Sequence, residues 1–226
     1  MTNVAKRLKI VRDDLALAEQ KSGRERGSVT LVAVSKTHSQ ATVSEAIEAG
    51  QTVFGENRVQ EAMAKWPDLK AKYENVELHL IGPLQSNKCA NAVALFDVIE
   101  TIDREKIARE ISREIAKQGV DPRLFVQVNT GAEPQKAGVA VEETIEFVRL
   151  CEQEYDLNIS GLMCIPPFGE DPGPHFDRLA ELASACGLGE LSMGMSGDYA
   201  TAIEHGATQV RIGSAIFGER QVFRAE

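Results

Sequence analysis

Lys36 follows an apolar, β-branched run, and a lysine in that position could attack a carbonyl group. The stretch LVAVSKTHS, residues 31–39, has the composition of a buried strand that stops at the lysine among small polar residues. Partial burial lowers the pKa of a lysine toward the range in which the neutral amine is a nucleophile. Lys36 is therefore a candidate for Schiff-base chemistry, whereas its alternative role is that of a solvated surface residue.

Residues 191–220, LSMGMSGDYATAIEHGATQVRIGSAIFGER, hold two places where an apolar run ends in small polar residues. The first run ends in Ser196, Gly197 and Asp198, and the second ends in Gly213 and Ser214. Backbone N–H groups at the start of a helix, with a serine hydroxyl and a permissive glycine backbone, form a cradle for an anion. The alternative is that Ser196 or Asp198 only caps the helix that follows.

Lys36 and this cradle together suggest one ligand that carries both an aldehyde and a phosphate group. The aldehyde would meet the lysine while the phosphate rests on the two late loops. Pyridoxal 5'-phosphate has both groups on one small ring. Further residues stand at the ends of other apolar runs and could share the site: Asn57, His79, Gly82, Met163 and Arg211.

The elements that would position these residues alternate along the chain. Helical patterns with terminating glycines at Gly50, Gly119, Gly187 and Gly206 lie between short β-rich runs. Eight such runs are predicted to be strands: residues 29–36, 52–56, 77–82, 97–102, 123–130, 159–165, 190–194 and 208–214.

Strand followed by helix, repeated about eight times without a linker, predicts an α/β fold of one (β/α)8 TIM barrel. An amphipathic N-terminal helix over about residues 3–20 precedes the barrel, which covers about residues 29–220 of a single 1–226 domain. A doubly wound open sheet is the alternative, but no GxGxxG follows the first strand. In a barrel, the carboxyl ends of the strands meet at one mouth, which would bring Lys36 to the late loops.

Composition and charge disfavour several classes of partner. Of 226 residues, 43% are hydrophobic, and 25 Lys+Arg against 34 Asp+Glu give a net charge of −9, which disfavours nucleic acid. Four widely spaced cysteines show no metal-binding pattern, so we expect no metal and a reduced, cytoplasmic protein. The N-terminus has no apolar signal core and no run is long enough for a membrane span, so we expect no membrane partner.

Seven motifs carry a resemblance to a known family: AVSKTH, FGENRVQE, HLIGPLQSNK, VNTGAEPQKAG, GLMCIPP, LSMGMSGD and VRIGSAIFG. Over about residues 5–220, the chain resembles the pyridoxal 5'-phosphate homeostasis protein family, which is related to the barrel domain of alanine racemase. The resemblance implies a fold-type III barrel that binds pyridoxal 5'-phosphate. One departure is Arg58, where many members carry an aromatic residue.

The resemblance implies a role for each residue of the predicted site. Lys36 forms the internal aldimine with the cofactor, and Arg211 faces the nitrogen of the pyridine ring. Three residues hold the phosphate: Ser196, Gly213 and Ser214. Asn57 and Met163 lie near the ring. No residue is assigned to catalysis.

The resemblance also implies a role in the homeostasis of pyridoxal phosphate with little or no catalysis. Arg211 is always charged and only donates, so it would keep the ring nitrogen unprotonated and weaken the electron sink. Related racemases work with such an arginine, but they add a β-rich domain that builds the dimer and supplies a tyrosine base. Here only Tyr199 is expected near the site. We therefore expect a monomer that contacts apo-enzymes transiently.

Two other functions stay open at this point. The first is a pyridoxal phosphate-dependent racemase or decarboxylase acting on small amino acids. The second is a cofactor-free aldolase of the same barrel class, in which Lys36 would bind its substrate directly. Visible absorption from a bound cofactor would separate the aldolase from the other functions.

Four further residues have a structural interpretation beside a functional one. His79 lies inside a predicted strand and is expected to be a hydrogen-bonded core residue rather than a base. Lys136 either reaches over the mouth or is a solvated loop residue. Cys164 is expected to be buried and inert. Pro67 predicts the end of a helix, because the residue before a proline disfavours helical backbone.

Overall fold

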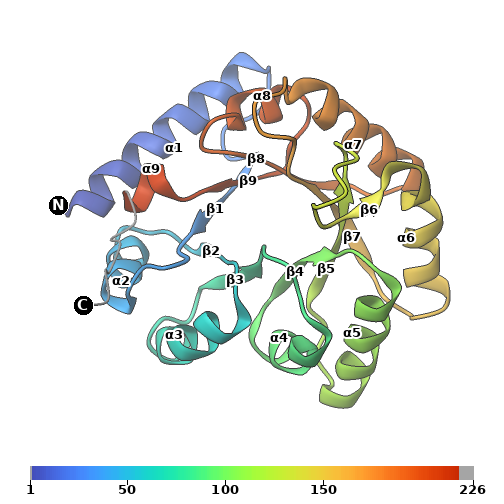
Figure 1. The fold of residues 1–226 in the computed structure, drawn as a ribbon. Helices are drawn as coiled ribbons and strands as arrows, with labels where there is room; N and C mark the ends of the chain where they lie inside the picture. The colour runs from blue at the N-terminus through green and yellow to red at the C-terminus, as the bar shows by residue number, and fades with distance from the viewer. Residues whose placement is uncertain (1, 219–226) are drawn as a thin grey trace.

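The structure is a computed structural model that describes residues 2–218 of the chain. Within these residues, eight parallel strands close into a barrel at the centre of the molecule (Figure 1). They are β1 (Thr30–Val34), β2 (Val53–Glu56), β3 (Glu77–Leu80), β4 (Val98–Ile102), β5 (Arg123–Asn129), β7 (Ile159–Cys164), β8 (Glu190–Met195) and β9 (Gln209–Ile212). Because β4 pairs with β5 and β9 pairs with β1, the barrel is confirmed and the doubly wound sheet is ruled out.

All eight predicted runs contain a strand, and one further strand was not predicted. β6 (Val139–Ala140) has two residues and pairs with β5 outside the closed barrel. β1 ends at Val34, so Lys36 lies in the loop just after the strand. The predicted end of the barrel near residue 220 lies outside the described residues.

Helices form a ring around the strands (Figure 1). They are α2 (Gln40–Glu48), α3 (Val59–Lys72), α4 (Cys89–Leu95), α5 (Glu105–Gln118), α6 (Thr144–Gln153), α7 (Gly173–Cys186), α8 (Tyr199–Glu204) and α9 (Ser214–Phe217). Each helix buries its apolar face against the outward side chains of the strands, which makes the main hydrophobic core a layer between strands and helices. Within residues 2–218, no helix combines the length and the apolar character needed to cross a bilayer.

α1 (Asn3–Lys21) is the predicted N-terminal helix. Thr2 is the N-cap residue of this helix, and its side chain accepts a hydrogen bond from the Ala5 N–H. The buried face of α1 includes Val4, Leu8 and Val11, spaced as an amphipathic helix requires. α1 packs against α2, α8 and α9, and therefore covers the outside of the barrel where the first and last strands meet (Figure 1).

The predicted helix ends are confirmed except at Pro67. Gly119 and Gly187 cap α5 and α7 in the left-handed conformation, with φ of 67° and 72°, which a side chain would disfavour. α3 instead continues through Pro67 to Lys72. The physical reason is burial, because Trp66 and Leu69 hold this part of the helix against the barrel and outweigh the local cost of the proline.

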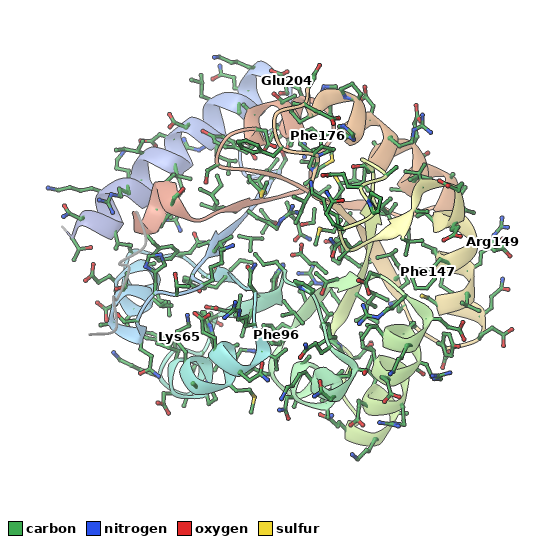
Figure 2. All side chains as sticks on the ribbon, in the orientation of Figure 1. Lys65, Phe96, Phe147, Arg149, Phe176 and Glu204 are labelled. Carbon is green, nitrogen blue, oxygen red and sulfur yellow. The ribbon has the colours of Figure 1, made fainter. Side chains whose placement is uncertain are left out.

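The interior of the barrel holds buried polar side chains at several levels. Alternate residues of a strand face opposite sides, so Leu78 and Leu80 face the helices while Glu77 and His79 face inward. Figure 2 shows side chains with nitrogen and oxygen atoms within the ring of strands. Polar groups buried there need partners, and their bonds link one strand to another across the interior.

Candidate functional site

A cavity of about 570 Å³ opens at the carboxyl ends of the strands. It is the size of a small-molecule site and lies where barrels commonly place their functional residues. Six of the seven residues predicted to bind a cofactor line it: Lys36, Asn57, Ser196, Arg211, Gly213 and Ser214. The structure thus brings together residues at the ends of β1, β2, β8 and β9, which are far apart in the sequence.

Met163 is the predicted residue that does not line this cavity. It is fully buried in β7. Ile165, two residues further along the same side of the strand, lines the cavity instead. Since two residues advance a strand by about 7 Å, Met163 lies one level deeper, beneath the floor of the cavity.

The loop that carries Lys36 is held by Lys65 of α3, a residue that the sequence analysis did not select. The Lys65 ammonium donates to the carbonyl of Ser35 at 2.9 Å and to the carbonyl of His38 at 3.2 Å. Glu61 accepts a hydrogen bond from the N–H of Thr37 between them. These bonds fix the backbone on both sides of Lys36. They also hold Thr37 at a φ of 66°, a left-handed conformation that a β-branched residue rarely adopts.

Lys65 is itself half of a buried ion pair. Its ammonium lies 2.7 Å from Oε1 of Glu56, and both side chains are almost completely buried. The same Glu56 oxygen accepts hydrogen bonds from Ser35 Oγ and Trp66 Nε1. A charge pair taken out of water is expensive to break, because the remaining partner stays buried without compensation. The pair therefore makes the position of the Lys36 loop difficult to change. Figure 2 labels Lys65 on α3.

Asn57 presents an unused acceptor at the wall of the cavity. Its Oδ1 is buried and accepts no hydrogen bond from the described residues. Buried polar atoms are nearly always paired with protein or with a bound molecule, so this oxygen calls for a donor that the described residues do not supply. A ligand with a hydroxyl or an N–H group could provide it.

The loops after β8 and β9 bring hydroxyl groups and small residues to the part of the cavity next to the β1 end. Ser196, Gly197, Gly213 and Ser214 all line it. Asp198 does not cap α8 through its side chain, but accepts a hydrogen bond from the N–H of Met195 at 2.6 Å. That bond closes the turn and leaves Ser196 and Gly197 exposed toward the cavity. Hydroxyl and glycine N–H groups suit an anion such as phosphate.

Arg211 lies at the cavity floor, with only 4% of its surface exposed. One terminal nitrogen donates to Ser192 Oγ at 2.7 Å, and the other donates to the carbonyl of Cys164 at 2.8 Å. These bonds use two of the five N–H groups of a guanidinium. The side chain is therefore fixed in place and retains donors for an acceptor in the cavity.

Five residues with open interpretations lie outside the lining of the cavity. His79 is fully buried and bonded to two carboxylates, as expected for a core histidine. Lys136 donates to the carbonyl of Pro166 and pairs with Glu133. Burial raises the pKa of the Cys164 thiol to about 12, which makes it a poor nucleophile. Two residues beside the site are placed at helix starts: Arg58 just before α3 and Tyr199 at the first turn of α8.

Several lining residues were missed by the sequence analysis. Val34 and Ile81 form apolar walls. Val34 ends β1 two residues before Lys36, and Ile81 follows β3 directly before Gly82. The position alone could have indicated them. The other missed lining residues are His38, Ile165, Met195 and Gly218, whereas Gly197 belongs to the predicted anion cradle. The missed residues are brought in by loop geometry that the sequence pattern does not encode.

Comparison with known proteins identifies the family. A family model described as "Alanine racemase, N-terminal domain" matches residues 8–221. A Pyridoxal phosphate homeostasis protein from Vibrio alginolyticus is 40% identical over 97% of this chain and 99% of its own length. One from Pseudomonas aeruginosa is 41% identical, with 97% of each chain covered. The chain belongs to the pyridoxal phosphate homeostasis protein family.

This membership confirms the resemblance that the seven motifs indicate. Solved structures of similar proteins have the same barrel fold as this member of the pyridoxal phosphate homeostasis protein family. PipY of Synechococcus elongatus, solved with PLP bound, is 37% identical, has a TM-score of 0.82 and is matched over 100% of its chain and 95% of this one. Alanine racemase from Corynebacterium glutamicum, at 16% identity and a TM-score of 0.68, shares the barrel fold.

Proposed function

We propose that this protein binds pyridoxal 5'-phosphate in the cavity at the barrel mouth and serves its homeostasis in the cytoplasm, with little or no catalysis. The observation that carries the proposal is that Lys36, the unused acceptor of Asn57 and the hydroxyl-bearing loops of Ser196 and Ser214 line one cavity. The names of the relatives and the PLP-bound PipY structure support the same ligand. Residues 1–226 act as one domain and as a monomer.

The residues present fit this ligand. Its aldehyde needs an amine, and Lys36 supplies one. Its phosphate needs several donors, which the hydroxyls of Ser196 and Ser214 and the neighbouring glycine N–H groups supply. Its flat ring needs apolar walls and a partner for its polar groups, and Ile81 and the Oδ1 atom of Asn57 meet those needs.

Each lining residue has one task in the proposed binding. Lys36 would hold the aldehyde end of the ligand, since its amine is a nucleophile of the kind that attaches carbonyl groups covalently with loss of water. Arg211 donates to the ring nitrogen and, because it holds its proton, keeps that nitrogen unprotonated. When bound, pyridoxal phosphate supplies an electron sink for reactions at amino-acid α-carbons. Arg211 weakens that sink and thereby favours storage and transfer over catalysis.

The partners of a carrier are proteins that lack the cofactor. We propose that apo-enzymes dependent on pyridoxal phosphate contact the mouth of the barrel transiently and accept the cofactor there. The exposed positions of Ser196 and Ser214 support release at that side, since solvent and a partner reach the phosphate-facing loops directly. Light scattering of the purified protein should give the mass of one chain.

The deciding experiment compares transfer with catalysis in the purified, cofactor-loaded protein. We expect the protein to restore activity to an apo-enzyme. We also expect exchange of the α-proton of alanine, serine or lysine in heavy water to be no faster than with free cofactor. Exchange far above that rate, lost in Lys36→Ala, would establish the racemase alternative. Absence of visible absorption after addition of pyridoxal phosphate would instead favour the aldolase.

A further inference from the structure

Arg211 is connected to a chain of buried polar side chains that runs down the inside of the barrel. Ser192 Oγ lies 2.7 Å from an Arg211 nitrogen and 2.5 Å from Oε2 of Glu100. The other Glu100 oxygen lies 2.6 Å from Nδ1 of His79. Ser192, Glu100 and His79 are fully buried, so water does not screen these contacts.

The chain continues to the opposite end of the barrel. Nε2 of His79 lies 2.7 Å from Oε1 of Glu77, which also accepts a hydrogen bond from Arg123 at 2.6 Å. Arg123 then pairs with Glu190 at 3.1 Å. The last three side chains are partly exposed, so the charged network begins beneath the cavity and ends at the opposite rim.

Hydrogen-bond accounting fixes the protons of this network. The bond to His79 and the charges of His79 and Arg123 hold the pKa of Glu77 below its ordinary value, which favours an ionised Glu77 that accepts from Nε2 of His79. Nδ1 faces Glu100, whose second oxygen faces the hydroxyl of Ser192. Both ring nitrogens are opposed by carboxylates, an arrangement that favours the doubly protonated, positively charged imidazolium of His79.

The surroundings of His79 and Glu100 support that assignment. Burial lowers the pKa of His79, but the hydrogen bonds and charges of Glu100 and Glu77 outweigh it, and the net direction is upward. Burial raises the pKa of Glu100, yet the bond to His79, the charges of His79 and Arg211 and the bond to Ser192 bring it below its ordinary value. The buried carboxylate is thus charged and balanced by His79 on one side.

The Ser192 hydroxyl has one orientation under these conditions. It accepts from Arg211, which only donates, so it must donate its proton to Glu100. Arg211 is consequently held by a neutral hydroxyl that a carboxylate orients, and the negative charge of Glu100 is taken up mainly by His79. This arrangement fixes the guanidinium without placing a carboxylate directly on it.

We propose that Ser192 and Glu100 are positioning residues that set the orientation and donor strength of Arg211 toward a ligand in the cavity, with protonated His79 as the counter-ion of Glu100. This inference rests on the proposed binding of pyridoxal phosphate at that cavity. Arg211 at its upper end is the contact through which the buried charges influence the ring. The polar interior of the barrel is then part of the binding site as well as of the core.

The test uses Ser192→Ala, which removes the link and leaves Glu100 and His79 facing each other. We expect this variant to bind pyridoxal phosphate about tenfold more weakly and to shift the visible absorption band and its pH dependence. Ser192→Thr, which retains the hydroxyl, should restore both properties. Ser184→Ala, at an exposed serine of α7, is the matched control and should behave as wild type. An unchanged band and affinity in Ser192→Ala would refute the positioning role.

A second measurement uses the wild-type protein without cofactor, so it does not depend on whether a variant folds. Nitrogen-15 NMR of the imidazole groups in the wild-type apo-protein should show both nitrogens of His79 still protonated as the pH rises past the ordinary histidine pKa of about 6.5. A neutral His79 would overturn the inference even if pyridoxal phosphate binds. Failure of the wild-type protein to bind pyridoxal phosphate would overturn the proposed function, while the imidazole signal still reports on the network.

Discussion

Gly82 packs so closely against Asn57 that a Cβ built on Gly82 would lie 2.2 Å from the Asn57 carbonyl oxygen. The second backbone atom in reach, the Asn57 Cα, would be 2.7 Å away. Neither atom is the end of a flexible side chain, so a larger residue at 82 must move the backbone. The loop after β3 therefore sets the position of Asn57 and of its unused oxygen.

Gly82→Ala should lower both stability and affinity for pyridoxal phosphate. Overpacking of this kind costs about 1 to 3 kcal/mol, which lowers the melting temperature by several degrees. Moving Asn57 should weaken cofactor binding about tenfold, as measured by spectroscopic titration. Gly189→Ala is the matched control, because a Cβ there meets no atom within 4 Å and no positive φ is required. Equal affinity in both variants would contradict the role given to this contact.

Lys36→Ala should abolish covalent attachment of the cofactor. Borohydride reduction followed by peptide mapping should place the modification on Lys36 in the wild type and give no modified peptide in the variant. The barrel should stay folded, because the bonds that hold the loop are made by Lys65 and Glu61. Lys72→Ala, at an exposed lysine of α3, serves as the control. A labelled peptide from the Lys36→Ala protein would identify a different nucleophile.

Ser196→Ala and Ser214→Ala should weaken binding of pyridoxal phosphate specifically. Each removes one hydrogen bond to a charged group, worth about 1.5 to 3 kcal/mol, so the dissociation constant should rise about tenfold to a hundredfold. Pyridoxal, which lacks the phosphate, should bind poorly and respond little to either change. If both ligands weaken equally, the phosphate contacts other residues.

Lys65→Met should destabilise the protein more than a surface lysine change does. It leaves Glu56 buried without its counter-ion, which costs about 3 to 5 kcal/mol in comparable cases. Adding Glu56→Gln should recover much of that stability in urea unfolding. Even with its stability recovered, the double variant should attach pyridoxal phosphate more slowly than wild type in stopped-flow absorption. The reason is that the carbonyls of Ser35 and His38 have lost the ammonium that holds them. Attachment at the wild-type rate would show that the clamp serves stability alone.

Stability should depend on pH through His79. Its pKa in the folded protein lies above the ordinary value of 6.5, so its contribution is complete below about 6.5 and is lost as pH rises through the raised value. Glu100 has the opposite sign, since its lowered pKa adds stability that is lost as pH falls through that value. The unfolding free energy of wild type should therefore decline toward alkaline pH more steeply than that of His79→Gln. Parallel profiles would exclude a charged His79.

The strands and their order around the barrel could be predicted from the sequence because local patterns carry that information. Short β-rich runs between helical patterns, with glycines such as Gly119 and Gly187 at helix ends, are readable without tertiary contacts. Pro67 shows the limit of this reasoning. The local rule predicts a helix end, and the helix persists because buried Trp66 holds it to the barrel.

Only those site residues that stand at recognisable strand ends could be predicted from the sequence. Lys36 and Ser214 stand out because they end apolar runs, and both line the cavity. Met163 was assigned to the same level although it lies deeper, since a pattern of alternating residues gives the side of a strand but not its height in the barrel. Lys65 and Glu100 were missed because charged residues within a helix or strand give no sign of the buried partners that they meet in the fold.

Pairing of the first strand with the last has a consequence for synthesis on the ribosome. β1 can find β9, and α1 can pack against α9, only after nearly all of the barrel has emerged. Such long-range closure is slow compared with the formation of local helices. Lys36 is translated early and Ser214 late, so a nascent chain that stops at β8 displays the lysine without β9 and the Ser214 loop that line the same cavity beside it. The complete lining of the cavity, with Lys36 and Ser214 together, therefore exists only once the ring has closed.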